Sequence, residues 1–398
     1  MKGTSPPRSI VVVGGGVFGA SAALSLRKRD YAVTLVDPGP LPHPDASSTD
    51  ISKVVRPDYG ADDFYMELME RSLAGFRSWN QAWGERLFHE DGFLLMTRQP
   101  MSEGGFEHDS FTRLTKRGHV PERVDANALR ARFPAWAEGI YVDGYRSPQA
   151  GWAESGRIVE RLLGDGRRAG VVVRDRFAVT SLLQEGSRVT GVRAEDGRTL
   201  SASWVVVAAG AWTPTLLPHL AEDMWAVGQP VFHFRPERPE DYRPPHFIPW
   251  AADISKTGWY GFPVSAEGIV KVAHHGVGRR VDPRAPRVVH ASEEARFRAF
   301  LRETFPSLEA AELASTRLCL YCDTRNGDFW IDHDASLEGL VIAAGGSGHA
   351  FKFAPIIGDV IADVVEKKPN PYAGRFARRD RGEVTTERAR SLVGAREE

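Results

Sequence analysis

The sequence has very few cysteines: only Cys319 and Cys322 occur among its 398 residues. This count excludes the disulfide frameworks that hold many small secreted proteins together. A zinc site built on this C-x-x-C spacing would need further ligands, and the chain has no other cysteine. We therefore expect no metal site.

Long apolar runs are also absent. No stretch approaches the roughly 20 apolar residues that span a bilayer, so we expect no membrane as a partner. Residues 1–9 contain two prolines and no apolar signal segment before the first predicted strand, which makes the cytoplasm the expected location.

Neither sign of charge is in excess, because 51 Lys and Arg residues stand against 52 Asp and Glu residues and the formal net charge is −1. This balance gives no electrostatic reason to expect a nucleic acid as a partner. With 42% hydrophobic residues, a chain of this length can bury a large core, and we expect two connected domains.

What the sequence does contain is a glycine-rich turn after a short apolar strand. Residues 11–19 read VVVGGGVFG, with the G-x-G-x-x-G spacing of a turn that binds a dinucleotide. Gly14 would permit the tight turn, Gly16 would let the backbone approach a pyrophosphate, and Gly19 would let the following helix lie close to the sheet. The amino end of that helix would face the phosphates.

A second apolar strand is expected over residues 31–36, and Asp37 ends it about 18 residues after Gly19. A carboxylate at this place can bind a ribose 2′-hydroxyl, which favours FAD or NAD over NADP. An ordinary βαβ turn without a ligand is the alternative interpretation.

Hydrophobic periodicity organises the rest of the chain. Helical spacing predicts helices over 62–83 and 125–133, a helix that Ser155 caps and that runs to Leu163, and a helix over 356–365. Strands are expected over 171–173, 178–183, 189–194, 204–212, 228–234, 258–263, 268–275 and 339–344. Beyond Tyr372 the chain is rich in Arg and Glu, so we expect a solvated or frayed end.

Several motifs occur in an order that resembles one known family. They are the turn at 14–19, DISKVVR at 50–56, WYGFP at 259–263, Lys271 with His275, CLY at 319–321 and GSGHAFKF at 346–353. Together they resemble monomeric sarcosine oxidase and its relatives, which include N-methyltryptophan oxidase, pipecolate oxidase and the fructosyl amino acid oxidases. The resemblance covers nearly the whole chain.

The fold that this resemblance implies is α/β with two domains. A Rossmann-like FAD-binding domain, discontinuous in the sequence, would comprise residues 1–88, 152–218 and 326–398. A substrate domain with a mainly antiparallel sheet would comprise residues 89–151 and 219–325.

The resemblance also implies a covalent link to FAD. A cysteine at the position of Cys319 forms a thioether to the flavin 8α-methyl carbon in this family, and a thiolate is a suitable nucleophile for such a carbon. A buried structural thiol is the alternative. We interpret Cys322 as structural.

Two cations match the family pair that binds the substrate carboxylate. Arg56 would supply a fork of donors and Lys352 a point charge. A surface position is the default alternative for either residue alone. Lys352 lies between Phe351 and Phe353, an apolar setting in which an unpaired ammonium group is costly.

Four further residues match positions around the reacting centre. Lys271 would activate oxygen, although the sequence also allows the polar face of an edge strand. His275 would line the substrate pocket, where its ring can accept from or donate to the amine; a structural histidine is the alternative. Tyr321 and Trp259 would be walls of the pocket, with core packing as the competing interpretation.

Some positions depart from sarcosine oxidase. Thr49 replaces a histidine, Lys53 replaces an arginine beside the flavin ring, and Trp259 replaces the first of two tyrosines. The D-x-x-K pattern that ends at Lys53 is closer to the fructosyl amino acid oxidases. Those enzymes, however, generally carry an acid at the position of His275 and lack Lys352.

The resemblance thus implies two sets of site residues. The expected catalytic set is Lys271, His275, Arg56, Lys352, Tyr321, Trp259 and Lys53. The expected cofactor-binding set is Gly14, Gly16, Val17, Phe18, Gly19, Asp37, Ser48, Lys53, Val179, Gly210, Trp212, Cys319, Gly346, Gly348 and Lys352.

From these residues we expect a monomeric FAD-dependent oxidase of secondary amino acids, such as sarcosine or another N-methyl or cyclic imino acid. Its partners would be the amino acid and molecular oxygen, and its products an imine and hydrogen peroxide. A fructosyl amino acid oxidase is one alternative, and a FAD-dependent amine dehydrogenase that passes electrons to a carrier is another. A non-catalytic flavin-binding protein and a plain NAD dehydrogenase fit the motifs less well.

Overall fold

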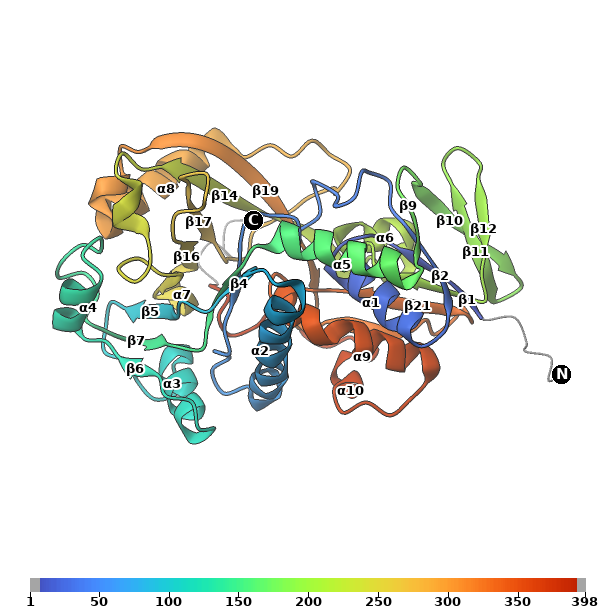
Figure 1. The fold of residues 1–398 in the computed structure, drawn as a ribbon, viewed down its shortest axis with the longest axis horizontal. Coiled ribbons are helices and arrows are strands. Elements are labelled where there is room, and N and C mark those ends of the chain that lie inside the picture. Colours follow the sequence, from blue (N-terminus) through green and yellow to red (C-terminus); the bar gives the residue numbers. More distant parts are fainter. Residues whose placement is uncertain (1–7, 392–398) are drawn as a thin grey trace. The chain divides into compact units, whose positions relative to one another are not determined.

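The computed structural model describes residues 8–391 (Figure 1). By their internal contacts these residues form two compact units. Unit 1 comprises residues 8–50, Glu154–Ala226 and Leu320–Thr386, and unit 2 comprises Ile51–Ala153, Val227–Cys319 and residues 387–391. Both units are assembled from segments that are far apart in the sequence.

A six-stranded sheet is the centre of unit 1, with the strand order β20-β21-β13-β1-β2-β9. Its strands are β1 (Ser9–Val13), β2 (Ala32–Val36), β9 (Val172–Arg174), β13 (Trp204–Val207), β20 (Trp330–His333) and β21 (Leu340–Ala344). Only β20 runs antiparallel to its neighbour. Because β1, β13 and β21 are covered on both faces, they read as continuous apolar runs in the sequence.

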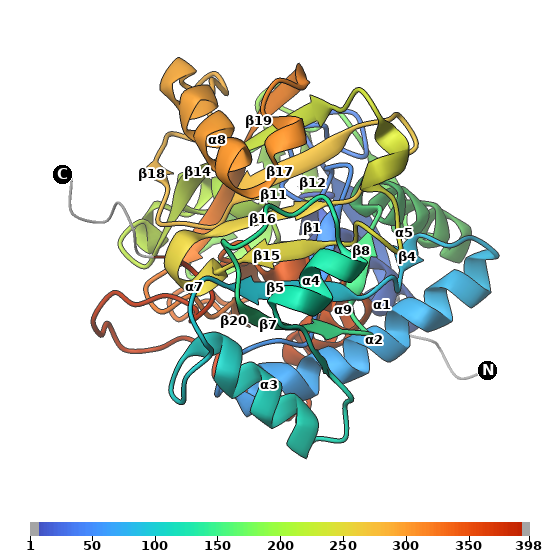
Figure 2. The ribbon, with the colours of Figure 1, turned by 90° about the vertical axis from the view of Figure 1, so that its left-hand side faces the viewer.

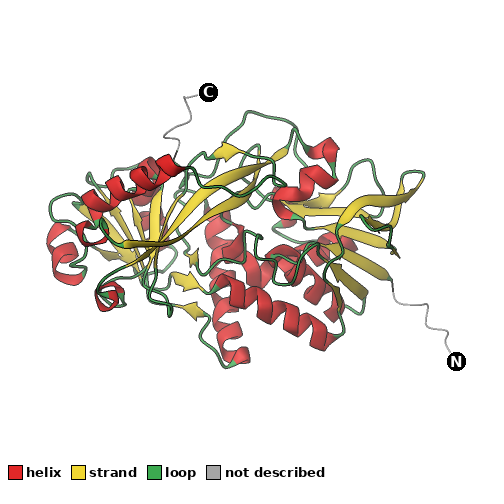
Figure 3. Cartoon of the chain, turned by 90° about the horizontal axis from the view of Figure 1, so that it is seen from above, coloured by secondary structure: helices red, strands yellow, loops and turns green. Residues whose placement is uncertain are grey.

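Helices of unit 1 cover this sheet (Figures 1 and 3). They are α1 (Val17–Lys28), α5 (Ser155–Ala169), α6 (Thr213–Leu216), α9 (Ala354–Glu366) and α10 (Ala373–Phe376), with 3-10 turns at Gly210–Trp212, Pro218–Leu220 and Ala350–Phe353. Helix α1 packs on both α5 and α9. At Gly358 of α9, a Cβ would lie 2.4 Å from the carbonyl oxygen of Ser21 in α1, so a small residue is required there.

A second, antiparallel sheet of unit 1 consists of β10 (Val179–Glu185), β11 (Arg188–Ala194) and β12 (Thr199–Ser201). The strands predicted over 178–183 and 189–194 correspond to β10 and β11. The strand predicted over 204–212 is shorter than expected: β13 ends at Val207, and Gly210–Trp212 form a 3-10 turn.

Unit 2 is built on a nine-stranded sheet with the order β18-β14-β17-β16-β15-β5-β7-β6, in which β19 pairs with β14 (Figure 2). Its strands are β5 (Phe93–Thr97), β6 (Glu122–Arg123), β7 (Asp143–Ser147), β14 (Met224–Arg235), β15 (Trp250–Ala252), β16 (Trp259–Phe262), β17 (Val270–His274), β18 (Arg279–Arg280) and β19 (Glu312–Thr324). Most pairs are antiparallel, whereas β15 and β5 are parallel. The chain passes between the units within β14 and within β19.

Aromatic side chains fill the core of unit 2. Trp250 is buried and lies with its ring centroid 4.8 Å from that of Phe305 and 5.7 Å from that of Trp136.

The remaining elements are the small sheet of β3 (Lys53–Val55), β4 (Phe88–His89) and β8 (Gly151–Ala153), the helices α2 (Asp63–Trp83), α3 (Phe106–Lys116), α4 (Ala126–Arg132), α7 (Ile254–Thr257) and α8 (Ala291–Thr304), and 3-10 turns at Pro239–Tyr242 and Pro306–Leu308.

Helices α2 and α4 form where the periodicity predicts them, and the carboxylates of Asp62 and Asp125 accept hydrogen bonds at their amino ends. The prediction for α5 was wrong in two respects. The helix runs to Ala169, and Glu154 rather than Ser155 is its N-cap. The hydroxyl of Ser155 donates instead to the carbonyl of Asp50, 2.7 Å away.

The prediction of a solvated end beyond Tyr372 was also wrong for part of that segment. Phe376 is buried in unit 1 and stacks on Phe329 with a centroid distance of 4.9 Å. In unit 2, Ala389 and Ser391 are fully buried. Residues 380–385 are exposed, as expected, and residues 392–398 lie outside the described part of the chain.

Within residues 8–391, none of the helices combines the length and the apolar character that crossing a membrane requires.

Candidate active site

The glycine turn of unit 1 has the close contacts that its spacing predicts. Gly14 has a φ of +104°, and a Cβ on it would lie 2.5 Å from the carbonyl oxygen of Ala208. A Cβ on Gly19 would lie 1.8 Å from the carbonyl oxygen of Gly14. Helix α1 has no acidic residue in its first turn, and its N-cap residue, Gly16, has no side chain that could cap it. The positive end of the helix therefore suits a phosphate group.

The carboxylate of Asp37 fixes this turn. One oxygen accepts from the backbone N–H of Gly15 at 2.7 Å, and the other accepts from the N–H of Gly39 at 3.1 Å. Burial raises the pKa of Asp37 despite these two hydrogen bonds. Each oxygen keeps a second lone pair that can accept from a ribose hydroxyl. The N–H of Phe177 donates to the Asp37 carbonyl at 2.8 Å, which places Val179 two residues from this contact.

The other predicted cofactor residues in the first two segments of unit 1 lie beside the start of α1 or directly after β13. The hydroxyl of Ser48 accepts from the N–H of Val17 at the start of α1, at 3.2 Å. Phe18 is buried in the same helix. Gly210 and Trp212 form the 3-10 turn directly after β13, where Gly210 has a φ of +53°.

The glycine-rich loop after β21 is attached to the end of β19. The N–H of Ser347 donates to the carbonyl of Cys322 at 2.9 Å. A Cβ on Gly348 would lie 2.2 Å from the ring of Tyr321, so this ring needs a glycine beside it. A Cβ on Gly346 would lie 2.8 Å from the Cβ of Ala350, at the start of the turn that holds Lys352. The side chain of Lys352 is buried, which excludes the surface alternative.

The two cysteines differ in their surroundings. In unit 2, Lys53 Nζ lies 3.9 Å from the sulfur of Cys319 and can donate a hydrogen bond to it. In unit 1, burial raises the pKa of Cys322 to about 12, so this thiol stays protonated at neutral pH. Because the thiolate is the reactive form, Cys322 is unsuited to a covalent role.

Arg56 of unit 2 is a buried cation surrounded by aromatic rings. Only 4% of the residue is exposed, and its guanidinium carbon lies 5.8, 5.8 and 5.4 Å from the ring centroids of Tyr59, Phe93 and Phe106. It donates a hydrogen bond to the carbonyl of Asp58. Among residues 8–391, Arg56 makes no ion pair with a carboxylate. The carboxylate of the neighbouring Asp58 instead accepts a hydrogen bond from the hydroxyl of Tyr145 at 2.5 Å.

Lys271 lies inside the large sheet of unit 2. Strand β17 has β14 and β16 on its two sides, so the edge-strand alternative is excluded. Only 1% of Lys271 is exposed. Its ammonium group donates to the carbonyl of Ser52 at 2.7 Å and lies 4.6 Å from the centroid of the Phe262 ring.

Trp259 and Lys271 lie on opposite faces of this sheet. Phe262 is the cross-strand partner of Lys271, and side chains alternate along β16, so Tyr260 shares their face whereas Trp259 does not. The Trp259 ring instead stacks on Phe300 of α8 with a centroid distance of 4.4 Å. Core packing therefore describes Trp259. Tyr260 is a site candidate that sequence reasoning missed, because the period of two along the strand does not fix its register against β17.

His275 follows β17 and is buried. Its Nε2 lies 2.5 Å from Oε1 of Glu387, a residue of the C-terminal segment that sequence reasoning also missed. Burial lowers the pKa of His275, and the hydrogen bond with Glu387 opposes this effect only in part. The composition of the C-terminal segment contained no signal for this contact.

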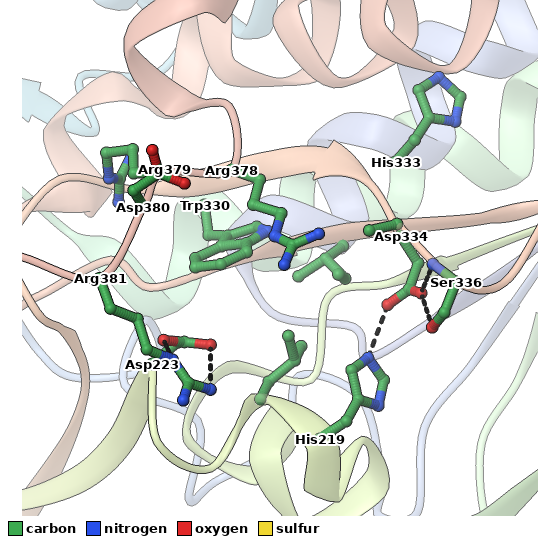
Figure 4. Close-up of a pocket in the computed structure, with 13 residues that line it drawn as sticks. His219, Asp223, Trp330, His333, Asp334, Ser336, Arg378, Arg379, Asp380 and Arg381 are labelled. Carbon is green, nitrogen blue, oxygen red and sulfur yellow. Dashed lines mark hydrogen bonds and ion pairs between the residues drawn. The ribbon is translucent and has the colours of Figure 1, made fainter.

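Unit 1 also contains a cavity of about 510 Å³ (Figure 4). It is lined by His219, Leu220, Asp223, Trp330, His333, Asp334, Ala335, Ser336, Ile342, Arg378, Arg379, Asp380 and Arg381. His219 pairs with Asp334 at 2.6 Å and Arg381 with Asp223 at 2.8 Å. The predicted cofactor and substrate residues are not among its lining, so this cavity is not part of the candidate active site.

Comparison with known proteins identifies relatives along most of the chain. The model of the FAD dependent oxidoreductase family, DAO, matches residues 9–364. The monomeric sarcosine oxidase of Bacillus sp. (strain B-0618) is 25% identical over 362 residues, which cover 89% of this chain and 91% of that protein. The N-methyl-L-tryptophan oxidase of Yersinia pestis (strain Pestoides F) is 26% identical over 371 residues, which cover 91% and 96%.

A solved structure shows the same fold. The fructosyl amine:oxygen oxidoreductase Amadoriase I from Aspergillus fumigatus matches with a TM-score of 0.80 at 24% identity, covering 94% of this chain and 90% of that one.

Proposed function

The chain belongs to the FAD dependent oxidoreductase family, and from this premise we propose that it oxidises a secondary amino acid to an imine. Its relatives indicate an oxidase of the amino acid type. Its mixed α/β fold agrees with the fold that was predicted from the sequence.

The observation that carries the substrate class is the buried guanidinium of Arg56. A buried cation is costly unless an anion or several dipoles compensate it. The rings of Tyr59, Phe93 and Phe106 and one backbone carbonyl supply part of this compensation. The carboxylate of an amino acid would complete it with a bidentate pair. Lys352 is the proposed second cation of this clamp.

The residues of unit 1 fit FAD. The turn leaves no space for a Cβ at Gly14 or Gly19, and the amino end of α1 can accept the pyrophosphate. Asp37 keeps acceptor capacity for the ribose. We propose that these residues, with Ser48 and the loop before Lys352, hold the cofactor, and that the segments of unit 1 belong to its binding domain.

The residues of unit 2 would serve the reaction. FAD, when bound, supplies the acceptor for the hydride equivalent that leaves the amine carbon, and oxygen then takes the two electrons to give hydrogen peroxide. Lys271 would hold a positive charge where superoxide develops. His275 would contact the substrate amine, which must be unprotonated to react. Lys53 would border the same centre, and we propose the same role for Tyr321, which belongs to unit 1.

The substrates that we propose, in order of preference, are an N-methyl amino acid such as sarcosine, a cyclic imino acid such as pipecolate or proline, and a fructosyl amino acid. The side chain of the substrate depends on wall residues, and a single altered wall residue can change which amine fits. Tyr260 is such a wall candidate in place of Trp259. A monomeric state and a cytoplasmic location are part of the same proposal.

The direct test of the function is an anaerobic panel of sarcosine, other N-methyl amino acids, pipecolate, proline and fructosyl-valine. We expect an N-methyl or cyclic amino acid to bleach the flavin absorbance most rapidly. Selective bleaching by fructosyl-valine would favour the fructosyl amino acid oxidase instead. If none of these amines bleached the flavin of the holoenzyme, the proposed function would be wrong.

Replacing Lys271 by Met tests whether oxygen is the acceptor. The substitution removes the buried charge and retains an apolar side chain of similar length. We expect it to slow reoxidation of the reduced enzyme by oxygen by at least about a hundredfold, because one group that stabilises developing charge contributes on that order. Reduction by substrate should change much less. A dehydrogenase would form little peroxide and would show no such loss of reoxidation.

The two cysteines give a matched test of covalent attachment. After acid precipitation, we expect flavin colour to remain with the polypeptide in the parent protein and in Cys322→Ala, because Cys322 is buried and protonated. In Cys319→Ala the colour should appear in the supernatant. Free flavin from the parent protein, or retained colour in Cys319→Ala, would contradict the assignment of Cys319.

A further inference from the structure

The C-terminal segment of unit 2, residues 387–391, brings a carboxylate to a proposed substrate residue. Glu387 Oε1 lies 2.5 Å from His275 Nε2, and only 7% of each of the two side chains is exposed. We infer that Glu387 is a positioning residue, which keeps the proton of His275 on Nε2 and thereby makes Nδ1 the hydrogen-bond acceptor of the ring. This inference rests on the proposed function, because that function places His275 at the substrate.

The backbone of the segment is fixed on both sides of this contact. The N–H of Ser391 donates to the carbonyl of His275 at 3.1 Å, and its hydroxyl donates to the carbonyl of Lys256 at 2.7 Å. The guanidinium of Arg388 donates to the carbonyl of Gly104 at 2.8 Å and lies 3.3 Å from a carboxylate oxygen of Asp109. These anchors place Glu387 in a defined position, as a positioning role requires.

The choice of tautomer follows from the chemistry of the pair. A neutral imidazole carries one proton, so one ring nitrogen donates and the other accepts. An ionised carboxylate can only accept, and it therefore selects the tautomer with the proton on the nitrogen that faces it. With Glu387 at Nε2, the lone pair is on Nδ1. The sequence left open whether His275 accepts from the amine or donates to it, and Glu387 favours acceptance.

The charges around His275 favour the neutral ring. Burial lowers the pKa of His275, Glu387 raises it, and the guanidinium groups of Arg390 and Arg56 lower it further. The neighbouring ring of His274 has its own pKa lowered to about 3, chiefly by burial, and is neutral as well. A neutral His275 can accept a hydrogen bond from an amine that has lost its extra proton, which is the form that reacts.

The test uses two substitutions at Glu387 and one control. Glu387→Ala removes the acceptor, and Glu387→Gln keeps an oxygen acceptor without the charge. Glu383→Ala changes an exposed carboxylate of the same C-terminal part of the chain and serves as the matched control. If Glu387→Ala does not fold, Glu387→Gln and the parent protein still decide the question.

The first readout is the ¹⁵N spectrum of the imidazole groups in the FAD-bound enzyme without substrate, assigned with His275→Asn. We expect His275 of the parent protein to show a protonated Nε2 and an unprotonated Nδ1. Glu387→Ala should shift the ring toward a mixture of tautomers, Glu387→Gln should shift it less, and Glu383→Ala should not shift it. A proton on Nδ1 in the parent protein, or an unchanged spectrum in Glu387→Ala, would overturn the inference.

The second readout is the rate constant of anaerobic flavin reduction, measured with the substrate that the amine panel identifies. We expect Glu387→Ala to lower this constant by about tenfold or more, because a misplaced proton acceptor loses part of its contribution. Affinity for the substrate should change less, since the carboxylate clamp is separate. An unchanged or faster reduction in Glu387→Ala would show that the segment only fills space. Failure of the whole panel would refute the proposed function, whereas the ¹⁵N spectrum would still decide the tautomer.

Discussion

Burial of positive charge is the constraint on which the described structure depends most. Arg56, Lys271 and Lys352 are all less than one-tenth exposed. Each would be costly in an apolar interior without compensating groups. Arg56 is compensated by three aromatic rings and a carbonyl, and Lys271 by a carbonyl of Ser52 and the ring of Phe262. The arrangement at Arg56 suits a cation that also meets a ligand, because a full ion pair within the protein would leave its guanidinium no capacity for a substrate.

The features that could be predicted from the sequence are those that local chemistry determines. The glycine turn at Gly14 and Gly19 is specified by backbone contacts that no Cβ permits, so its spacing alone indicates the structure. The buried parallel strands read as apolar runs because both of their faces are covered. Helix α2 shows both its periodicity and its cap at Asp62 in the sequence.

The features that could not be predicted depend on register or on distant contacts. Trp259 and Tyr260 are neighbours in the sequence, and only the pairing of β16 with β17 decides which of them shares a face with Lys271. Glu387 lies 112 positions after His275, in a segment whose composition favours solvent exposure. The motif resemblance could name His275, but nothing in the sequence pattern connects it to a carboxylate from the C-terminal end.

The central claim is that Arg56 binds the carboxylate of the substrate. The most direct measurement compares anaerobic flavin reduction by sarcosine with reduction by dimethylamine, which lacks the carboxylate, in the parent protein, Arg56→Lys and Arg56→Met. A charged hydrogen-bonded pair is worth about 1.5–3 kcal/mol. We therefore expect the preference of the parent protein for sarcosine to fall on the order of tenfold to a hundredfold in Arg56→Met and less in Arg56→Lys, with dimethylamine little affected. An equal loss for both amines, or an unchanged preference, would contradict the claim.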